Sequence, residues 1–236
     1  MTAMAADDRT QVMPTVEWLL AASPVDYAAA VDFMRVRGDA IARGSATELI
    51  WLLEHAPVYT AGTSTEPRHM PAGTGITIIP AERGGSLTYH GPGQRVAYTL
   101  LDVRQRSGGD VRAFVKLLER WVIGALLRLG VNAFVAAGRP GVWVEDASAL
   151  NGQSKLAALG LRVRNGVSRH GLSINVDPDL EAFTRIIPCG LEGFGVTSLA
   201  RLGRPASLQA VDAALKASFQ EIVETQVAGG LRMRPL

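Results

Sequence analysis

The 236-residue sequence contains a single cysteine, Cys189, and only three lysines. One cysteine excludes a disulfide framework and a zinc site built from cysteines alone. Charged residues make up 19% of the chain and hydrophobic residues 47%, a composition that excludes intrinsic disorder. The formal net charge of +2 is too small for a protein dedicated to nucleic acid, so we expect no nucleic-acid partner.

The chain also lacks a long apolar run. Its most apolar stretch, residues 121–131, contains Arg128 and is far shorter than the roughly 20 residues that a membrane span needs. Asp7 and Asp8 precede the first brief apolar run, which is not typical of a secretory signal. We therefore expect no membrane partner and a cytoplasmic protein, in which the thiol of Cys189 stays reduced.

Lysine is rare although basic residues are not. Of the 24 basic residues, 21 are arginines, and the lysines are Lys116, Lys155 and Lys216. Arginine cannot release its proton in a protein, whereas lysine can. Each lysine is therefore a candidate for a role in proton transfer.

Three segments carry helix signals. Ser23-Pro24 has the form of an N-cap followed by proline at the first helical position, and it predicts a helix that continues to Gly44. Residues 110–129 repeat apolar side chains at helical spacing after Asp110 as the N-cap. Residues 207–225 predict a third helix, which begins after a serine cap.

Short apolar runs alternate with these helices. Residues 49–53 and 76–79 predict buried strands, and the residues between them from 60 to 75 predict a loop because they are rich in Gly, Thr, Ser and Pro. We find no linker or repeat. The sequence therefore predicts one domain over residues 1–236, with a flexible tail at residues 1–13.

A hairpin is the most readable local structure. Residues 155–164 and 167–176 flank Asn165-Gly166, a dipeptide favoured in two-residue type I′ turns. The register set by this turn places Gly160 opposite Gly171. Two facing glycines leave a patch of bare backbone against which a ligand can lie, but a bulge or a closely packed helix also explains them.

Residues 83–94 form a glycine-rich string between apolar runs. Glycines allow a ligand to approach the backbone closely, and Arg83, Thr88 and His90 supply hydrogen-bond donors. The string matches neither a phosphate-binding loop nor a dinucleotide-binding fingerprint.

Cys189 lies between a rigid proline and a permissive glycine. A free cysteine is either a small buried hydrophobe or a nucleophile, and a nucleophile needs a nearby cation that lowers its pKa. Lys155 is the candidate cation, with a solvated lysine at a strand end as the alternative.

The four histidines are dispersed along the chain. His90, His170 and Cys189 match no common zinc spacing, so we expect no metal. We expect His55 and His69 to lie on the surface or in loops.

Five motifs occur in a fixed order between Leu49 and Cys189. The motifs are Arg83–Gln94, Gly141–Val144, Lys155–Val163, His170-Gly171 and Pro188-Cys189-Gly190. Together they resemble the octanoyltransferase family of lipoate biosynthesis, the lipoyl(octanoyl) transferases.

The resemblance implies an α/β fold of the α+β type, with a mixed, largely antiparallel sheet flanked by helices as in biotin and lipoate protein ligases. It implies transfer of an octanoyl group from acyl carrier protein to a lysine of a lipoyl domain, in 2-oxoacid dehydrogenase complexes or the glycine cleavage H protein. No cofactor is implied beyond the phosphopantetheine arm of the carrier protein. We expect a monomer.

The resemblance also assigns roles. Cys189 matches the nucleophile that forms the acyl thioester, and Lys155 matches the lysine that lowers the pKa of that cysteine and acts as general acid and base. His170 is a further candidate. The positions that match acyl-binding residues are Arg83, Gly84, Gly85, Ser86, Leu87, Thr88, Tyr89, His90, Ala158, Leu159, Gly160, Gly171, Leu172 and Ser173. We expect Tyr89 and His90 to lie near the thioester.

The chemistry of the residues is compatible with this activity. Passing an acyl group from one thiol to another is nearly isoenergetic and amide formation is downhill, so no ATP is needed. Three alternatives remain: an ATP-dependent ligase on the same fold, a hydrolase that pairs Cys189 with His170 or His90, and an acyl-binding module without turnover. Residues 83–139 carry nine basic and three acidic residues, which predicts a basic face for acidic partners or a merely solvated helix surface.

Overall fold

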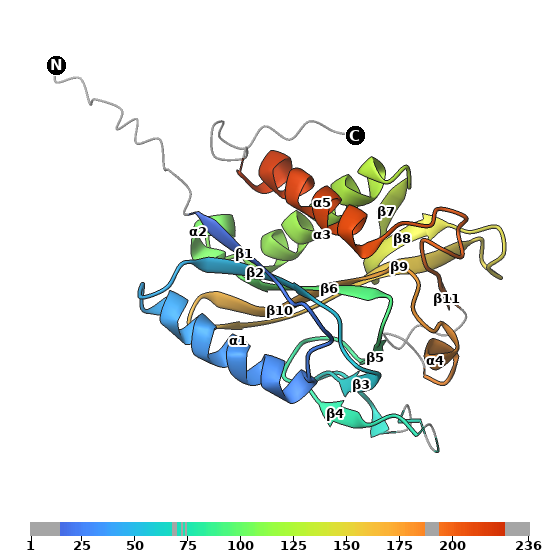
Figure 1. Cartoon of the computed structure of the whole chain (residues 1–236), viewed down its shortest axis with the longest axis horizontal. Helices are drawn as coiled ribbons and strands as arrows, with labels where there is room; N and C mark the ends of the chain where they lie inside the picture. Colours follow the sequence, from blue (N-terminus) through green and yellow to red (C-terminus); the bar gives the residue numbers. More distant parts are fainter. Residues whose placement is uncertain (1–14, 68–69, 72, 74, 187–193, 225–236) are drawn as a thin grey trace.

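The computed structural model describes residues 15–67, 70, 71, 73, 75–186 and 194–224, so the predicted tail at residues 1–13 lies outside it. An eight-stranded main sheet has the order β1-β2-β6-β10-β9-β8-β7, with β11 also paired to β9 (Figure 1). The β1–β2 and β9–β11 pairs are parallel and the other described pairs of this sheet are antiparallel. The predicted mixed, largely antiparallel sheet is confirmed. Its strands are β1 Val16–Leu20, β2 Glu48–Leu53, β6 Gln94–Leu100, β7 Ala133–Ala136, β8 Arg139–Glu145, β9 Gln153–Arg164, β10 Val167–Asn175 and β11 Gly195–Val196.

A small sheet lies beside the main one, with the order β4-β3-β5. Its strands are β3 Val58–Ala61, β4 Ile78–Pro80 and β5 Leu87–His90. Two expectations are corrected here. The predicted loop at residues 60–75 begins inside β3, which pairs with β5, and the strand predicted at residues 76–79 is shifted and only half-buried because it forms the edge of this sheet.

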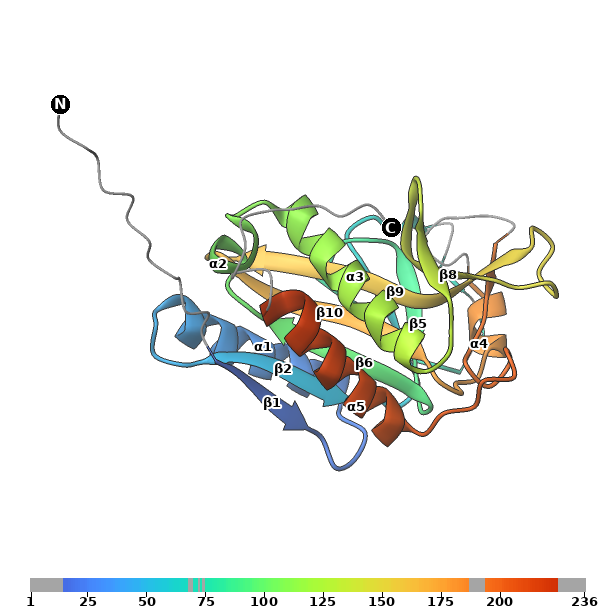
Figure 2. The ribbon, with the colours of Figure 1, turned by 90° about the horizontal axis from the view of Figure 1, so that it is seen from above.

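Helices cover both faces of the main sheet. Figures 1 and 2 show α1 on one face and α3 with α5 side by side on the other. The helices are α1 Tyr27–Ala42, α2 Val103–Ser107, α3 Val111–Arg128, α4 Glu181–Thr184, α5 Leu208–Phe219 and the π-helical turn η3 Gln220–Glu224. The predicted caps Asp110 and Ser207 are confirmed, since each side chain accepts a hydrogen bond from the first turn of its helix.

The start of α1 differs from the prediction. Asp26 caps the helix by accepting a hydrogen bond from the Ala29 amide, so Ser23 and Pro24 lie outside it. The preceding residue explains the shift: Val25 donates its amide to the Glu54 carbonyl and forms a β-bridge with His55. These contacts hold residue 25 in extended backbone and place Tyr27 in the first turn of the helix.

Strand alternation divides the core into two layers. On β2, Ile50 and Leu52 pack toward α3 and α5, while Leu49, Trp51 and Leu53 pack toward α1. Successive side chains of a strand point to opposite faces, so a strand buried on both sides is apolar at nearly every position.

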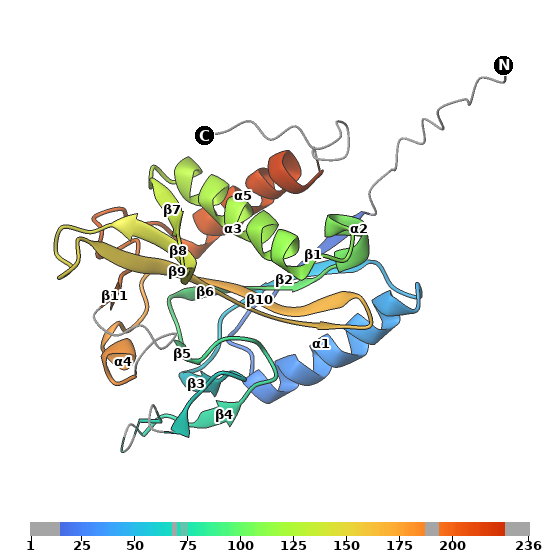
Figure 3. The ribbon, with the colours of Figure 1, turned by 180° about the vertical axis from the view of Figure 1, so that it is seen from behind.

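The β9–β10 hairpin has the predicted register. Gly160 pairs with Gly171, and both turn residues have positive φ, +53° at Asn165 and +82° at Gly166, as a type I′ turn requires. The described pairing of these two strands contains no bulge. Figure 3 shows how far this hairpin extends across the sheet.

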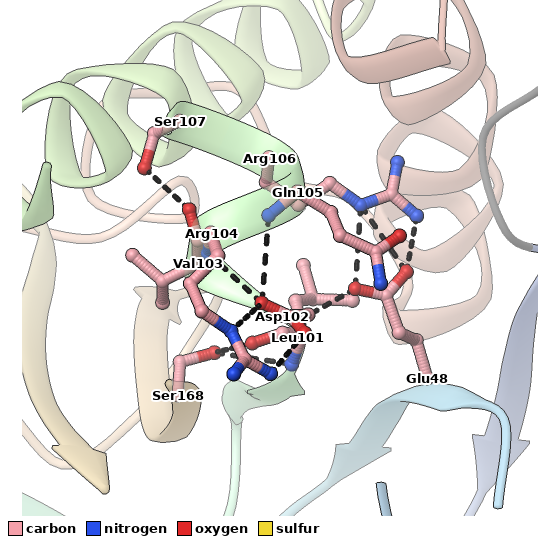
Figure 4. A network of polar contacts seen from close by, with 9 residues as sticks. All are labelled: Glu48, Leu101, Asp102, Val103, Arg104, Gln105, Arg106, Ser107 and Ser168. Carbon is pink, nitrogen blue, oxygen red and sulfur yellow. Dashed lines mark hydrogen bonds and ion pairs between the residues drawn. The ribbon is translucent and has the colours of Figure 1, made fainter. Parts of the chain in front are cut away.

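A buried ion pair joins the main sheet to α2 at the end of β6 (Figure 4). The side chains of Glu48 and Arg106 are 3% and 0% exposed and form this pair, and Glu48 also accepts the Asp102 amide at 2.6 Å. Asp102 caps α2 and pairs with the exposed Arg104 at 2.7 Å. Breaking a buried pair from one side leaves an uncompensated charge, so this network fixes α2 on the sheet.

Candidate functional site: a cavity lined by glycines and histidines

An open cavity of about 500 Å³ lies where β5, β6 and the β9–β10 hairpin meet the start of α1. It brings together twelve of the predicted site residues and adds Tyr27, Val96 and Tyr98, which the sequence analysis did not identify. The predicted residues that line it are Arg83, Gly85, Ser86, Thr88, His90, Ala158, Leu159, Gly160, His170, Gly171, Leu172 and Ser173.

Leu87 and Tyr89, which match acyl-binding positions of the family, do not line this cavity. They alternate with Thr88 and His90 along β5 and therefore point to its other face. There they belong to a hydrophobic cluster with Tyr59, Phe183 and Ile186. Tyr89 thus supports the segment before residue 187 from behind the cavity wall. Gly84 does not line the cavity either.

The facing glycines Gly160 and Gly171 line the cavity, and they also allow neighbouring backbone to pass close to β9 and β10. A Cβ on Gly160 would lie 3.1 Å from Arg83 Cδ and from the Gly84 carbonyl oxygen, and the Gly84 amide donates to the Leu161 carbonyl at 2.9 Å. The crossing element is therefore the 83–85 segment and not a helix. A Cβ on Gly171 would lie 2.1 Å from the Ala97 carbonyl oxygen, a distance that no side chain tolerates.

Arg83 holds this crossing segment in place. Its guanidinium is buried and donates to the carbonyl and hydroxyl oxygens of Thr60 at 2.6 and 2.7 Å and to the Ser86 carbonyl at 2.9 Å. These contacts join β3 to the cavity wall and place a cation close to the histidines.

His170 is held against α1 in a rare backbone conformation. Its φ of +61° lies in the left-handed region, which few residues other than glycine adopt. The Tyr27 hydroxyl lies 3.3 Å from His170 Nε2, and the two rings stack at 6.4 Å between centroids. Burial, and then the nearby charge of Arg83, lowers the pKa of His170 to about 4.

His55 is buried behind this pair, so the expectation of a surface position is wrong. Its side chain is 1% exposed, with Nδ1 2.6 Å from the Val25 carbonyl and Nε2 2.7 Å from the Tyr98 hydroxyl. A carbonyl only accepts, so Nδ1 carries the proton and Tyr98 donates to Nε2. Burial lowers the pKa of His55, which stays neutral.

His90 is held by a chain of buried amides. Its Nδ1 lies 2.6 Å from Gln94 Oε1, and the Gln94 amide nitrogen donates to Asn175 Oδ1 at 2.9 Å. Burial, and then the proximity of His55, lowers the pKa of His90 to about 3. The two histidines that line the cavity, His90 and His170, are therefore uncharged at neutral pH, as is His55 behind them.

Lys155 lies in a second, smaller cavity of about 280 Å³ next to the first. Thr88, Ala158 and Ser173 line both cavities, while Gln94 and Asn175 line the second one together with Lys155. Lys155 is 5% exposed, so the structure contradicts the alternative of a solvated lysine.

The neighbouring strands explain how this lysine is accommodated. Its partner in the register of β8 and β9 is Trp143, whose ring centroid lies 5.1 Å from Lys155 Nζ. Gly141, at φ +109°, leaves room for the lysine stem, because a Cβ there would lie 3.2 Å from Lys155 Cε. A cation over an indole face is stabilised by the ring quadrupole.

Cys189, Pro188 and Gly190 lie outside the described residues, as does His69. The residues on either side are placed. Phe183 lines the cavity of Lys155 and Ile186 packs in the cluster of Tyr59 and Tyr89. Phe194 contacts Trp143 at 5.5 Å between ring centroids.

The basic segment 83–139 is not a continuous basic surface. Arg83, Arg95 and Arg106 are buried, and Arg95 forms an ion pair with Asp212 at 2.7 Å. The exposed basic residues of α3 that follow one helical face at four-residue spacing are Arg112, Lys116 and Arg120.

The described residues contain no group of three or more His, Cys, Asp or Glu side chains able to hold a metal ion. None of their helices is long and apolar enough to cross a membrane.

Comparison with known proteins identifies the family. The family model for the lipoyl protein ligase A/B catalytic domain matches residues 26–220. An octanoyltransferase of Jannaschia sp. is 51% identical over 213 residues, which cover 88% of this chain and 98% of that protein.

Solved structures share the fold. A bipartite lipoate protein ligase of Thermoplasma acidophilum has a TM-score of 0.65 at 17% identity, covering 88% of this chain and 84% of that chain. A biotin protein ligase of Aquifex aeolicus, in complex with biotin and ATP, has a TM-score of 0.54 at 12% identity, covering 90% and 72%. The predicted likeness to these folds is confirmed. The chain belongs to the lipoyl protein ligase A/B catalytic domain family and, within it, to the octanoyltransferases, acyltransferase enzymes of lipoate biosynthesis.

Proposed function

We propose that this enzyme transfers an octanoyl group from octanoyl-acyl carrier protein to a lysine of a lipoyl domain through a thioester on Cys189. The acceptors are the lipoyl domains of 2-oxoacid dehydrogenase complexes and the glycine cleavage H protein. The observation that carries the proposal is the buried side chain of Lys155, which lines a cavity next to the larger, open one.

The larger cavity is suited to an acyl chain. Glycine backbone, Leu159 and Leu172 form part of its wall, and its histidines are neutral. At ~0.8 kcal/mol per buried methylene, an eight-carbon tail gains on the order of 5 kcal/mol from leaving water. This gain is large enough to favour donors with an eight-carbon acyl chain over donors with shorter acyl chains.

The reaction consists of two acyl transfers. In the first, the Cys189 thiolate attacks the thioester carbonyl, a new carbon–sulfur bond replaces the bond to pantetheine, and Lys155 gives a proton to the departing thiolate. In the second, the acceptor amine attacks the acyl-cysteine, a carbon–nitrogen bond replaces the carbon–sulfur bond, and the amine passes a proton to Lys155. No net proton, electron or phosphate is consumed, so the proposal needs neither cofactor nor metal.

Chain geometry supports a meeting of Cys189 and Lys155. Cys189 follows Ile186 by three residues, and three residues of extended chain span at most about 11 Å. On the other side, β11 pairs with β9 so that Val196 lies opposite Lys155, and the Thr197 amide donates to the Lys155 carbonyl at 3.0 Å. The end of the intervening segment at β11 is thus anchored beside this lysine, and Phe183, three residues before Ile186, lines the same cavity as Lys155.

Partner recognition and location complete the proposal. The exposed stripe of Arg112, Lys116 and Arg120 on α3 supports docking of acidic carrier proteins. We propose a monomer that works in the cytoplasm, where a free thiol stays reduced.

Intact mass after incubation with octanoyl-acyl carrier protein tests the function. We expect an added octanoyl mass that maps to Cys189 and disappears when a lipoyl domain is added. Cys189→Ala is expected to gain no mass and to transfer nothing, and Lys155→Arg is expected to keep the charge but lose most turnover. Full transfer by Cys189→Ala that depends on ATP identifies a ligase instead, and release of free octanoate in place of octanoyl-lysine identifies a hydrolase.

A further inference from the structure

The amide chain next to His90 begins at a group that can only accept hydrogen bonds. The main-chain carbonyl of Thr197 lies 3.0 Å from Asn175 Nδ2, and Thr197 is fully buried. Asn175 must therefore donate its NH₂ group to this carbonyl, which leaves its Oδ1 facing Gln94.

The orientation of the Asn175 amide in turn fixes the orientation of the Gln94 side-chain amide. Its Nε2 donates to Asn175 Oδ1 at 2.9 Å and to the Tyr89 carbonyl at 3.3 Å, so two acceptors fix the amide. Its Oε1 then faces His90 Nδ1 at 2.6 Å. An amide oxygen cannot donate, so Nδ1 of His90 carries the proton.

One proton is all that the His90 ring holds. Burial lowers its pKa to about 3, so at neutral pH the ring is uncharged. A neutral imidazole has one N–H and one lone pair. With the proton on Nδ1, the lone pair is on Nε2.

The supports of this arrangement are rigid. Gln94 is the first residue of β6 and Asn175 the last of β10, and the two positions pair directly in the sheet. Gln94 is 1% and Asn175 4% exposed. His90 lines the larger cavity while both amides line the cavity of Lys155, so the chain spans the junction between them.

We propose that Gln94 and Asn175 are positioning residues that hold His90 as its Nδ1–H tautomer, so that His90 Nε2 accepts a hydrogen bond from an N–H group of a substrate. This inference rests on the proposed function, in which two substrates bring such a group to the junction. One is the amide nearest the thioester in the pantetheine arm of the donor, and the other is the attacking amine of the acceptor lysine.

The tautomer is tested by nitrogen NMR on protein labelled with ¹⁵N-histidine, because the chemical shifts of the two ring nitrogens distinguish the tautomers. The signal of His90 is assigned by its loss in His90→Asn. We expect a protonated Nδ1 and an unprotonated Nε2 at pH 7. An Nε2–H form or an imidazolium at this pH would overturn the inference, whatever the enzyme acts on.

Two substitutions of Gln94 separate hydrogen bonding from shape. Gln94→Met keeps the volume but removes the acceptor, and we expect the Nε2–H tautomer to appear. Gln94→Glu restores an acceptor at Nδ1 and adds a charge that raises the pKa of His90. At pH 8 we therefore expect Gln94→Glu to be more active than Gln94→Met. As the pH is lowered, the activity of Gln94→Glu is expected to fall because His90 Nε2 becomes protonated. Gln105→Met, on the exposed surface of α2, is the matched control.

Single-turnover rates decide which substrate supplies the N–H. Loss of one hydrogen bond is expected to slow one half-reaction about tenfold in Gln94→Met. Slower acylation of Cys189 assigns the contact to the donor amide, and slower transfer from acyl-cysteine assigns it to the acceptor amine. Rates equal to those of Gln105→Met in both halves would contradict the inference, whereas a wild-type enzyme that forms no acyl-cysteine contradicts the proposed function and leaves the tautomer measurement valid.

Discussion

Two buried polar clusters lie at opposite ends of β6 and are built from opposite chemistry. At one end of β6, the cluster around Glu48, Asp102 and Arg106 is made of charges that pair with one another (Figure 4). At the other end, the cluster around His90 and Gln94 is made of neutral groups linked by hydrogen bonds.

The difference separates a folding role from a binding role. Paired charges satisfy each other and leave nothing for a ligand, so they fix α2 against the sheet. Neutral groups leave the cavity uncharged, so that it can accept an apolar chain. In return, His90 and His170 are held with pKa values far below the ordinary value. Three substitutions and one titration test this contrast.

The largest effect is expected from breaking the buried ion pair. Arg106→Ala leaves Glu48 buried without its partner and is expected to lower the free energy of unfolding by about 3–5 kcal/mol. Urea denaturation measures this loss. The double variant Glu48→Gln with Arg106→Met removes both charges but keeps an acceptor for the Asp102 amide, and it is expected to recover most of the loss. A double variant as unstable as Arg106→Ala would show that the charges do more than satisfy each other.

Acid is expected to destabilise the neutral cluster. The folded pKa values of about 3 for His90 and about 4 for His170 lie below the unfolded value near 6.5, so the unfolded chain binds more protons between these limits. The free energy of unfolding therefore falls as the pH drops through 6.5, by about 2 kcal/mol per histidine between pH 7 and pH 5. Denaturation at several pH values measures the slope, and His90→Asn is expected to reduce it by about one proton. An unchanged slope contradicts the assigned pKa direction.

Removal of one hydrogen bond from the neutral cluster is expected to cost less. Tyr27→Phe deletes the hydroxyl beside His170 Nε2 and is expected to lower the free energy of unfolding by about 1 kcal/mol. Tyr59→Phe is the matched control, since its hydroxyl donates to the Ala182 carbonyl at 2.8 Å and its ring packs in the hydrophobic cluster of Tyr89. Both variants are expected to lose similar stability in urea, but Tyr27→Phe alone is expected to alter the titration of His170.

The smallest effect is expected at the rim of the charged cluster. The side chain of Arg104 is 59% exposed although it pairs with Asp102, and solvent screens such a pair. Arg104→Ala is expected to leave the denaturation midpoint unchanged at low and at high salt. A loss close to that of Arg106→Ala would show that pairing rather than burial sets the strength of this network.

Some elements could be predicted because a single short segment contains all the residues that determine them. Asn165-Gly166 determines both a turn type and a register, so the hairpin and the facing glycines were predictable. The cap and the apolar period of α3 are likewise contained in one segment.

Other features depend on contacts between distant segments. The start of α1 depends on the bridge between Val25 and His55, and the burial of His55 depends on Tyr98. The strand β3 has no period long enough to detect, and the direction of Tyr89 follows from the phase of a strand that only the fold defines. Tyr27 and Asn175 acquire their positions in the same way, and no local pattern marks them.

The left-handed backbone at Gly141 also constrains how this chain can evolve. Any side chain there would collide with the Ala157 carbonyl oxygen at 2.7 Å and press on the aliphatic stem of Lys155. A single-base change in this codon would therefore misplace an ammonium group borne by a different strand, while every residue of the cavity kept its identity. Inactive alleles of this gene are to be looked for at such a hidden position as well as among the reactive groups.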